Sequence, residues 1–160
     1  MSNYIFLDID GVLNYTGLKT RAPYECMGIA QRPLNILKEI VKQTNGKLVL
    51  ISDWRLSFLP NDHMPKMADY ITKRLQSVGL SFELASQNHT YEIRAEEIKN
   101  WIESHKTAGY IILDDDDNRY YHNNAIKPHW MHIDYREGLR KKHIQEAIIK
   151  MKESIKPIEL

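Results

Sequence analysis

The feature that most constrains the fold is an alternation of short apolar runs with longer segments of helical periodicity. Four runs of strand length are rich in Ile, Leu, Val, Phe and Tyr: Tyr4–Ile9, Lys47–Ile51, Ser81–Ala85 and Tyr110–Leu113. Because these runs are nearly continuous rather than strictly alternating, they are typical of strands covered on both faces. A fifth strand is expected at Trp130–Ile133. The pattern predicts a mostly parallel, five-stranded sheet.

Helices are expected between and after these strands. Apolar residues recur at helical spacing in four segments: Leu34–Val41, Met67–Leu75, Ala95–Ile102 and Leu139–Met151. Pro33 and Pro65 favour the first turns of the first two helices. Left-handed residues that end a helix are expected at Asn45-Gly46, Gly79 and Gly109. The alternation predicts a Rossmann-like, doubly wound α/β fold with right-handed crossovers and helices on both faces of the sheet.

Length and charge narrow the classes of protein that this chain can represent. Its 160 residues correspond to a single domain, since a domain averages about 150 residues. Its 22 basic and 21 acidic residues leave a formal charge of +1. No large global field therefore draws the protein to nucleic acid or to an anionic membrane, and any such contact is expected to be local.

The sequence also bears on where the protein resides. A single cysteine, Cys26, excludes an internal disulfide and a cysteine-based zinc site. The start of the chain, Met1–Asp10, has neither the basic nor the long apolar region of a signal peptide. No apolar run has the length of about 18 residues that a membrane span needs. We therefore expect a cytoplasmic protein with neither a membrane nor a disulfide partner.

Acidic and hydroxyl residues follow three of the predicted strands. The segments are Asp8-Ile9-Asp10-Gly11, Ser52-Asp53-Trp54-Arg55 and Asp114-Asp115-Asp116-Asp117. Ligands of open α/β sheets bind outside the carboxyl ends of the strands, so these side chains are expected to converge. Gathered carboxylates repel one another and do not all stay ionised unless a cation lies among them. Mg²⁺ is the natural candidate, because it takes oxygen ligands and a substrate phosphate.

Such a site supports phosphoryl transfer. Asp8 can attack phosphorus as a carboxylate nucleophile and form an aspartyl phosphate. Asp10 can protonate the leaving oxygen and later activate water. A hydroxyl and a cation are then expected on the other phosphoryl oxygens, and Ser52 and Arg94 supply them. Lys99 is the nearest rival of Arg94, one turn or more further along the same predicted helix.

These residues carry a resemblance to a known family. Phe6–Leu13 resembles motif I of the haloacid dehalogenase (HAD) superfamily of phosphohydrolases. Ser52 matches motif II, Arg94 stands where motif III usually places Lys or Arg, and Ile111–Asp115 matches the acidic motif IV. A finer pattern resembles the HAD domain of Swiss Army Knife RNA repair proteins over nearly the whole chain: Val12-Leu13-Asn14, Ser52-Asp53-Trp54-Arg55, Arg94 with Glu97-Ile98 and Trp101, the acidic run, and Gly138-Leu139.

The resemblance implies a capless Rossmannoid phosphatase that processes phosphorylated RNA ends. It places Mg²⁺ on Asp8, on the backbone carbonyl of Asp10, and on Asp114 or Asp115. Asp114 is placed first, and the order within that pair stays open. Asp116 and Asp117 are expected to point into the following loop. The intervals between motifs hold only the predicted helices and strands, so residues 14–32 can form only a small flap. Residues 154–160 are expected to be a loose tail.

Three further residues are expected around the substrate. Gly11 lets the chain bend after Asp10. Asp53 stands where the family has a second Ser or a similar small residue, and it either alters the local charge or serves a turn. Arg55 is assigned to a further phosphate of the substrate or to a salt bridge.

Several other side chains have competing interpretations. Trp101 is expected in the core, while Trp54 and Tyr120-Tyr121 stay open as surfaces on which a base stacks. Arg140–His143 is either a solvated basic helix face or a contact to a phosphate backbone. The histidines are not expected to bind metal, because they lack a partner Cys and a helical His pair: His122, His129 and His132 are the candidates.

The sequence therefore predicts a Mg²⁺-dependent phosphomonoester hydrolase with a phosphorylated substrate, most simply an RNA or DNA end. One alternative keeps the chemistry and changes the substrate to a small metabolite, a nucleotide or a phosphoprotein. A second alternative is a non-catalytic α/β binding module that is phosphorylated on Asp8. The oligomeric state does not follow from the sequence.

Overall fold

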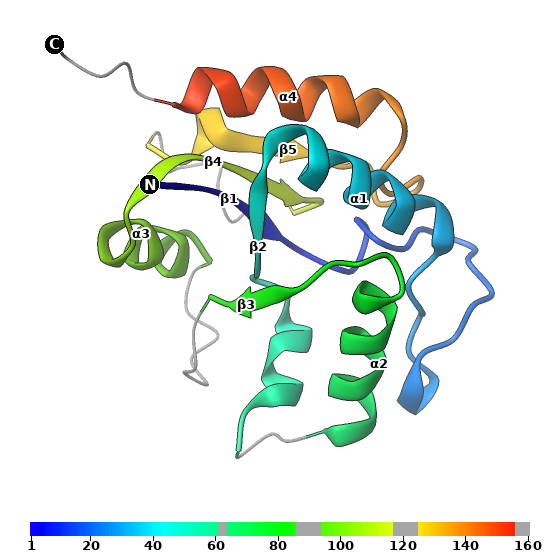
Figure 1. Ribbon diagram of the computed structural model, residues 1–160. Coiled ribbons are helices and arrows are strands. Elements are labelled where there is room, and N and C mark those ends of the chain that lie inside the picture. Colours follow the sequence, from blue (N-terminus) through cyan, green and yellow to red (C-terminus); the bar gives the residue numbers. More distant parts are fainter. Residues whose placement is uncertain (61–63, 86–93, 117–124, 156–160) are drawn as a thin grey trace, which may run out of the picture.

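The computed structural model describes residues 1–60, 64–85, 94–116 and 125–155 (Figure 1). Five strands are present: β1 (Ser2–Leu7), β2 (Gly46–Leu50), β3 (Phe82–Leu84), β4 (Thr107–Asp114) and β5 (Trp130–His132). The helices are α1 (Gln31–Thr44), α2 (Pro65–Gln76), α3 (Arg94–Ser104) and α4 (Lys142–Ser154). Three short 3₁₀ helices are η1 (Pro23–Glu25), η2 (Asp53–Phe58) and η3 (Lys127–His129).

The strands form one parallel sheet in the order β3-β2-β1-β4-β5. Leu7 of β1 pairs with Leu50 of β2 on one side and with Leu113 of β4 on the other. From β1, the chain adds β2 and β3 on one side of the sheet and then crosses over to add β4 and β5 on the other side of β1. In such sheets a crevice opens where the strand order reverses, here between the carboxyl ends of β1 and β4.

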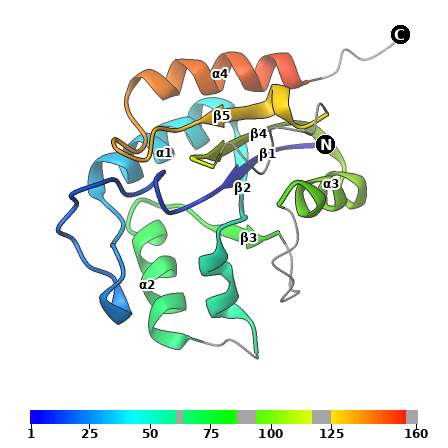
Figure 2. The ribbon, with the colours of Figure 1, turned by 180° about the vertical axis from the view of Figure 1, so that it is seen from behind.

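Both faces of the sheet are buried, which confirms the expected fold class. Ile5 and Leu7 of β1 join the larger core with α1, α2 and α4, and Tyr4 and Phe6 join a second core with α3. Figures 1 and 2 show α1 and α4 side by side and α3 on the other side of the sheet. Burial on both faces explains why the strands are almost wholly apolar.

Most of the predicted helix ends are confirmed. Pro65 begins α2, and α1 ends before Asn45, which has a left-handed φ of 51°. Gly79, after α2, has a φ of 78°. The prediction for Gly109 is wrong, because Gly109 lies inside β4. A Cβ there would lie 2.5 Å from Ser154 Oγ, so the glycine permits close approach of the end of α4 rather than ending a helix.

The last helix begins later than the periodicity indicated, at Lys142 instead of Leu139. Leu139 is nevertheless fully buried, and its N–H donates to the carbonyl of Val12 over 2.9 Å. Gly138 has a φ of 66°, and a Cβ there would lie 2.9 Å from the carbonyl oxygen of Asn14. The segment before α4 therefore packs on the backbone that follows β1.

Residues 14–32 make a short hairpin-like excursion between β1 and α1. Arg21 and Met27 form an isolated antiparallel bridge, and the tip is η1. The hydroxyl of Tyr70 in α2 accepts the N–H of Ile29 over 2.8 Å, which fixes the base of this flap. Among the described helices, none is long and apolar enough to cross a membrane.

Candidate active site

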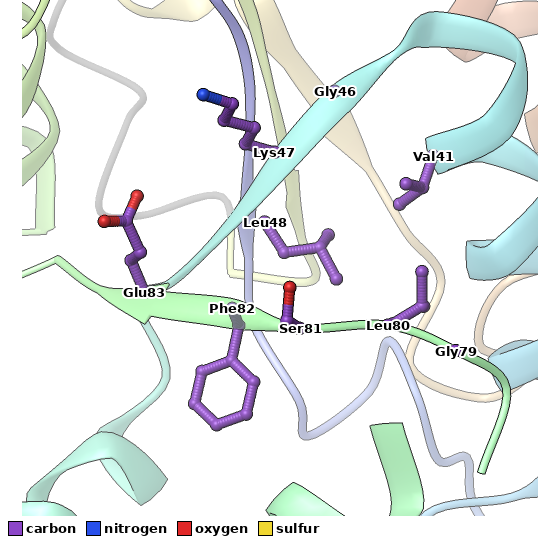
Figure 3. A pocket seen from close by; sticks show the side chains of 9 residues that line it. All are labelled: Val41, Gly46, Lys47, Leu48, Gly79, Leu80, Ser81, Phe82 and Glu83. Carbon is purple, nitrogen blue, oxygen red and sulfur yellow. The ribbon is translucent and has the colours of Figure 1, made fainter. Parts of the chain in front are cut away.

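Two hollows lie at opposite ends of the parallel strands. One is at the amino ends of β2 and β3 (Figure 3) and is lined by Val41, Gly46, Lys47, Leu48, Gly79, Leu80, Ser81, Phe82 and Glu83. The other, a cleft of about 200 Å³, is at the carboxyl ends of β1, β2 and β4 and is lined by Asp8, Asp10, Ser52, Asp53, Arg94, Asp115 and Asp116. The cleft at the carboxyl ends is the candidate site. It lies in the crevice between β1 and β4, and the acidic, hydroxyl and basic residues singled out in the sequence line it.

Three carboxylates gather at this site. Asp8, Asp114 and Asp115 each present an oxygen, and these oxygens lie within 4.8 Å of one another. Asp8 and Asp114 are buried and Asp115 is half-buried. The group offers only hard oxygen ligands in a small space, and it therefore fits Mg²⁺ or a similar divalent cation.

The pKa values of the clustered carboxylates also favour a bound cation. Burial raises the pKa of Asp8 well above its usual value; Arg94 opposes this effect, and the charges of Asp114 and Asp115 add to it. Burial also raises the pKa of Asp115, with the charge of Asp114 as the next cause. The ionised cluster thus holds more negative charge than its protein surroundings balance, and a bound cation would relieve it.

Both members of the acidic pair at the end of β4 reach the cluster, but they differ in access. Asp114 is fully buried; its Oδ2 lies 2.7 Å from Arg94 Nη1, and its Oδ1 accepts the N–H of Asp116. Of the two, Asp115 lines the cleft. Asp116 lines it as well, so the prediction that Asp116 points away into the following loop is wrong.

Gly11 is required by its surroundings. Its φ is 76°, a conformation that residues with a Cβ rarely adopt. A Cβ at this position would also collide with the carboxylate of Asp115. The glycine therefore shapes the site by allowing the chain after Asp10 to pass directly over Asp115.

Asp10 is exposed at the rim of the cleft, and two donors hold its carboxylate. The Asn14 side-chain amide donates to Oδ1 and the Trp54 indole N–H donates to Oδ2, each over 3.0 Å. Asn14 is held in turn by the N–H of Gly11, which donates to its side-chain oxygen over 2.8 Å. The sequence analysis assigned neither residue this role: Asn14 was quoted only in the motif, and Trp54 only as a stacking surface.

Ser52 and Asp53 enter the site from the end of β2. The Ser52 hydroxyl oxygen accepts the N–H of Trp54 over 3.2 Å and so caps η2. Its own O–H is left to donate, because a hydroxyl both accepts and donates. Asp53 begins η2 and is exposed, with Oδ1 3.7 Å from Arg94 Nη2.

Arg94 is the first residue of α3, and its guanidinium is buried against two strand ends. Its Nη1 lies 3.2 Å from Asp8 Oδ1 and 2.7 Å from Asp114 Oδ2. Lys99, its rival in the sequence analysis, lies on the exposed face of α3. The geometry therefore favours Arg94 as the cation beside Asp8.

Arg55 was predicted to bind a further phosphate of the substrate or to form a salt bridge, and the structure shows the salt bridge. It is buried, its Nη2 donates to Glu97 Oε1, and its Nη1 donates to the carbonyl of Ser52. Arg55 does not line the cleft. It joins η2 to α3 and so fixes the spacing between Ser52 and Arg94.

The remaining candidates lie outside the acidic cluster. Trp101 is 8% exposed and packs edge-on against Tyr4, which confirms it as a core residue. His129 stacks on Tyr110, and His132 Nε2 donates to the carbonyl of Asp115 over 3.0 Å. Four residues named in the sequence analysis lie outside the described residues: Asp117, Tyr120, Tyr121 and His122.

A match to a protein family shows to which family this chain belongs. The family described as the HAD domain in Swiss Army Knife RNA repair proteins matches residues 4–144. The chain belongs to this family. No match was found among the curated proteins or the solved structures. The matched range of the HAD domain includes β2 to β5, all of β1 except its first two residues, and every residue of the cleft. Membership in this family suggests a phosphatase.

Proposed function

We propose that this HAD domain is a phosphomonoester hydrolase that uses Asp8 as its nucleophile. The observation that carries the proposal is the position of Asp8, buried beside Arg94 and the acidic pair, with Asp10 held at the rim of the same cleft. A nucleophilic carboxylate, a second carboxylate for proton transfer, and a cation are the groups that this chemistry requires.

Mg²⁺ would be held by the carboxylates of Asp8, Asp114 and Asp115, with the backbone carbonyl of Asp10 as a further ligand. When bound, it supplies positive charge that polarises the phosphoryl oxygens and balances the acidic cluster. The proposal includes this ion because the oxygens of the three carboxylates lie close enough to share it.

The reaction proceeds in two displacements on phosphorus. An Asp8 carboxylate oxygen attacks phosphorus, the bond to the leaving oxygen breaks, and Asp10 transfers its proton to that oxygen. Asp10 then takes a proton from water, whose oxygen attacks phosphorus and breaks the bond to Asp8. Ser52 donates a hydrogen bond to a phosphoryl oxygen throughout, and Arg94 stabilises the charge on Asp8 and the phosphoryl group.

The substrate that we propose is the phosphate at a polynucleotide end. The description of the family as a domain of RNA repair proteins supports it, and so does a cleft that is open on the side of Asp10. The alternatives are a small phosphorylated metabolite, a nucleotide or a phosphoprotein.

The test is phosphate release from RNA and DNA oligonucleotides with 3′- or 5′-phosphates, from mononucleotides and from an aryl phosphate, each with Mg²⁺ or with EDTA. We expect turnover on oligonucleotide ends that is lost with EDTA and in Asp8→Asn. Asp69→Asn is the matched control, since Asp69 is an exposed carboxylate on α2 paired with Lys73. A preference for small esters would move the assignment to a metabolic substrate. A stable aspartyl phosphate without turnover would favour the binding module.

A further inference from the structure

A third hollow adjoins the active-site cleft, and the mechanism above does not use it. It has a volume of about 490 Å³ and shares Asp115 with the cleft. Its other lining residues are His132, Asp134, Tyr135, Arg136, Lys142 and His143. They belong to the end of β5, the start of α4 and the segment between them. Figure 2 shows this segment near the carboxyl end of β4.

Among the described residues that line this hollow, Lys142 is a cation with no carboxylate partner. Arg136 binds the carboxylate of Asp134 with both Nε and Nη2, the latter over 2.7 Å, so these two charges balance each other. Lys142 is exposed and makes no ion pair with any residue that the structure describes. It stands at the first position of α4, where the helix dipole adds partial positive charge.

A buried histidine adds a hydrogen-bond donor. His143 is 5% exposed, and its Nδ1 accepts the N–H of Arg140 over 2.8 Å. An accepting Nδ1 carries no proton, so the proton of the imidazole is on Nε2. Within the described part of the chain, Nε2 of His143 has no hydrogen-bond acceptor, although the residue lines the hollow. This N–H therefore stays available to a ligand or to water in the hollow.

We propose that this hollow is a second phosphate subsite, which binds the phosphodiester next to the terminal phosphate of a polynucleotide. The inference rests on the proposed function, since it assumes that the terminal phosphate lies at Asp8. Lys142 supplies the charge and His143 Nε2 the hydrogen bond. Tyr135 is 56% exposed at the rim and offers a ring on which the adjoining base stacks.

The minimal probe of this subsite is a nucleoside 3′,5′-bisphosphate, compared with the corresponding monophosphate and with an aryl phosphate. We expect the wild type to prefer the bisphosphate in kcat/KM. Lys142→Met removes a charge-assisted contact and should lower that preference roughly tenfold, mainly through KM. His143→Gln should act in the same direction. Lys152→Met, on an exposed position of α4, is the control and should keep the wild-type preference.

The outcomes separate this inference from the proposed function. Equal kcat/KM for bisphosphate and monophosphate, or an unchanged preference in Lys142→Met, would overturn the subsite while the phosphatase stands. If the wild type hydrolyses neither these probes nor the phosphorylated oligonucleotides, the proposed function fails, and calorimetry of bisphosphate binding to the wild type and to Lys142→Met decides the subsite. Binding that weakens in Lys142→Met supports it, and absent or unchanged binding refutes it.

Discussion

Asp8 shows how a single residue can report on the chemistry of a site. Asp8 is 4% exposed, and its carboxylate lies beside those of Asp114 and Asp115 and pairs with Arg94. Burial of so much like charge opposes folding unless a counter-charge is bound. The proposed binding of Mg²⁺ beside Asp8 should therefore stabilise the folded protein.

Mg²⁺ should raise the melting temperature more near pH 7.5 than near pH 5. The raised pKa values of Asp8 and Asp115 mean that the folded state holds protons which the unfolded state has released. Without metal, stability contributed by these groups therefore falls as pH rises above 3.8 toward the folded pKa values. Mg²⁺ at about 100 times its Kd would return about 2.7 kcal/mol where the carboxylates are ionised.

Thermal unfolding with and without Mg²⁺ at both pH values measures this effect. Asp115→Asn should reduce the shift, and Asp69→Asn should leave it intact. An equal shift at the two pH values would contradict the assignment of the cluster as the metal site.

Trp54→Phe should lower kcat roughly tenfold with little change in KM. The variant keeps a ring but removes the indole N–H that holds Asp10 Oδ2, and a hydrogen bond to a charged group is typically worth about that factor. Trp101→Phe is the matched control, because the Trp101 Nε1 has no acceptor among the described residues. Equal kinetic losses in the two variants would show that ring packing, rather than the hydrogen bond, matters.

Short elements hold the site together through contacts that cross the fold. Arg55 in η2 and Glu97 in α3 form a buried pair, and the segment before α4 supports the backbone after β1. Both contacts act on elements that carry cleft residues. Changes at these positions should therefore affect stability and the site together.

Arg55→Met should destabilise the protein by about 3 to 5 kcal/mol, because it removes the arginine that pairs with the buried Glu97 carboxylate. Lys73→Met breaks an exposed pair with Asp69 and should cost far less. Urea unfolding of both variants gives the comparison. Similar losses for the two would mean that the Arg55 pair adds nothing beyond a surface ion pair.

Gly138→Ala should destabilise the protein more than Gly17→Ala does. Both glycines have positive φ values, 66° and 84°, so both variants carry backbone strain of about 1 kcal/mol or more. Only at Gly138 does a Cβ also meet backbone, 2.9 Å from Asn14 O and 3.0 Å from Val12 O. The extra loss, measured by urea unfolding, should be accompanied by lower phosphatase activity, since Asn14 holds Asp10. Equal losses would show that the collision relaxes freely.

At the scale of the whole molecule, folding buries titratable groups that lie on separate elements around the sheet. His129 and His143 are examples, placed near β5 and in α4. Burial lowers the pKa of both below 6.5. They link the stability of the entire domain to pH.

Stability should fall as the pH drops below 6.5 through the folded pKa values of these histidines. The unfolded state binds protons there that the folded state does not, and so acid favours unfolding. Urea unfolding between about pH 5 and pH 7 measures the dependence. His129→Asn should flatten it, because this variant removes one of the two groups whose pKa burial lowers. A steeper dependence in His129→Asn would contradict the sign.

The secondary structure and the position of the candidate site could be predicted from local sequence patterns. The continuous apolar runs predicted the five strands, and helical spacing predicted α1 to α4, because each element buries a face set by its own sequence. The convergence of Asp8, Ser52, Arg94 and Asp115 followed from their places at strand ends and at the start of a helix. Parallel strands then bring such positions to one edge.

The sequence by itself therefore determined the elements, the sheet and the edge that carries the site. The tertiary structure decided which side chains meet: Trp54 with Asp10, 44 positions away, and Arg55 with Glu97, 42 positions away. It also decided that Gly109 serves packing rather than a helix end. The physical reason is that periodicity is a local property, whereas these contacts depend on how close-packed side chains from separate elements fill the same space.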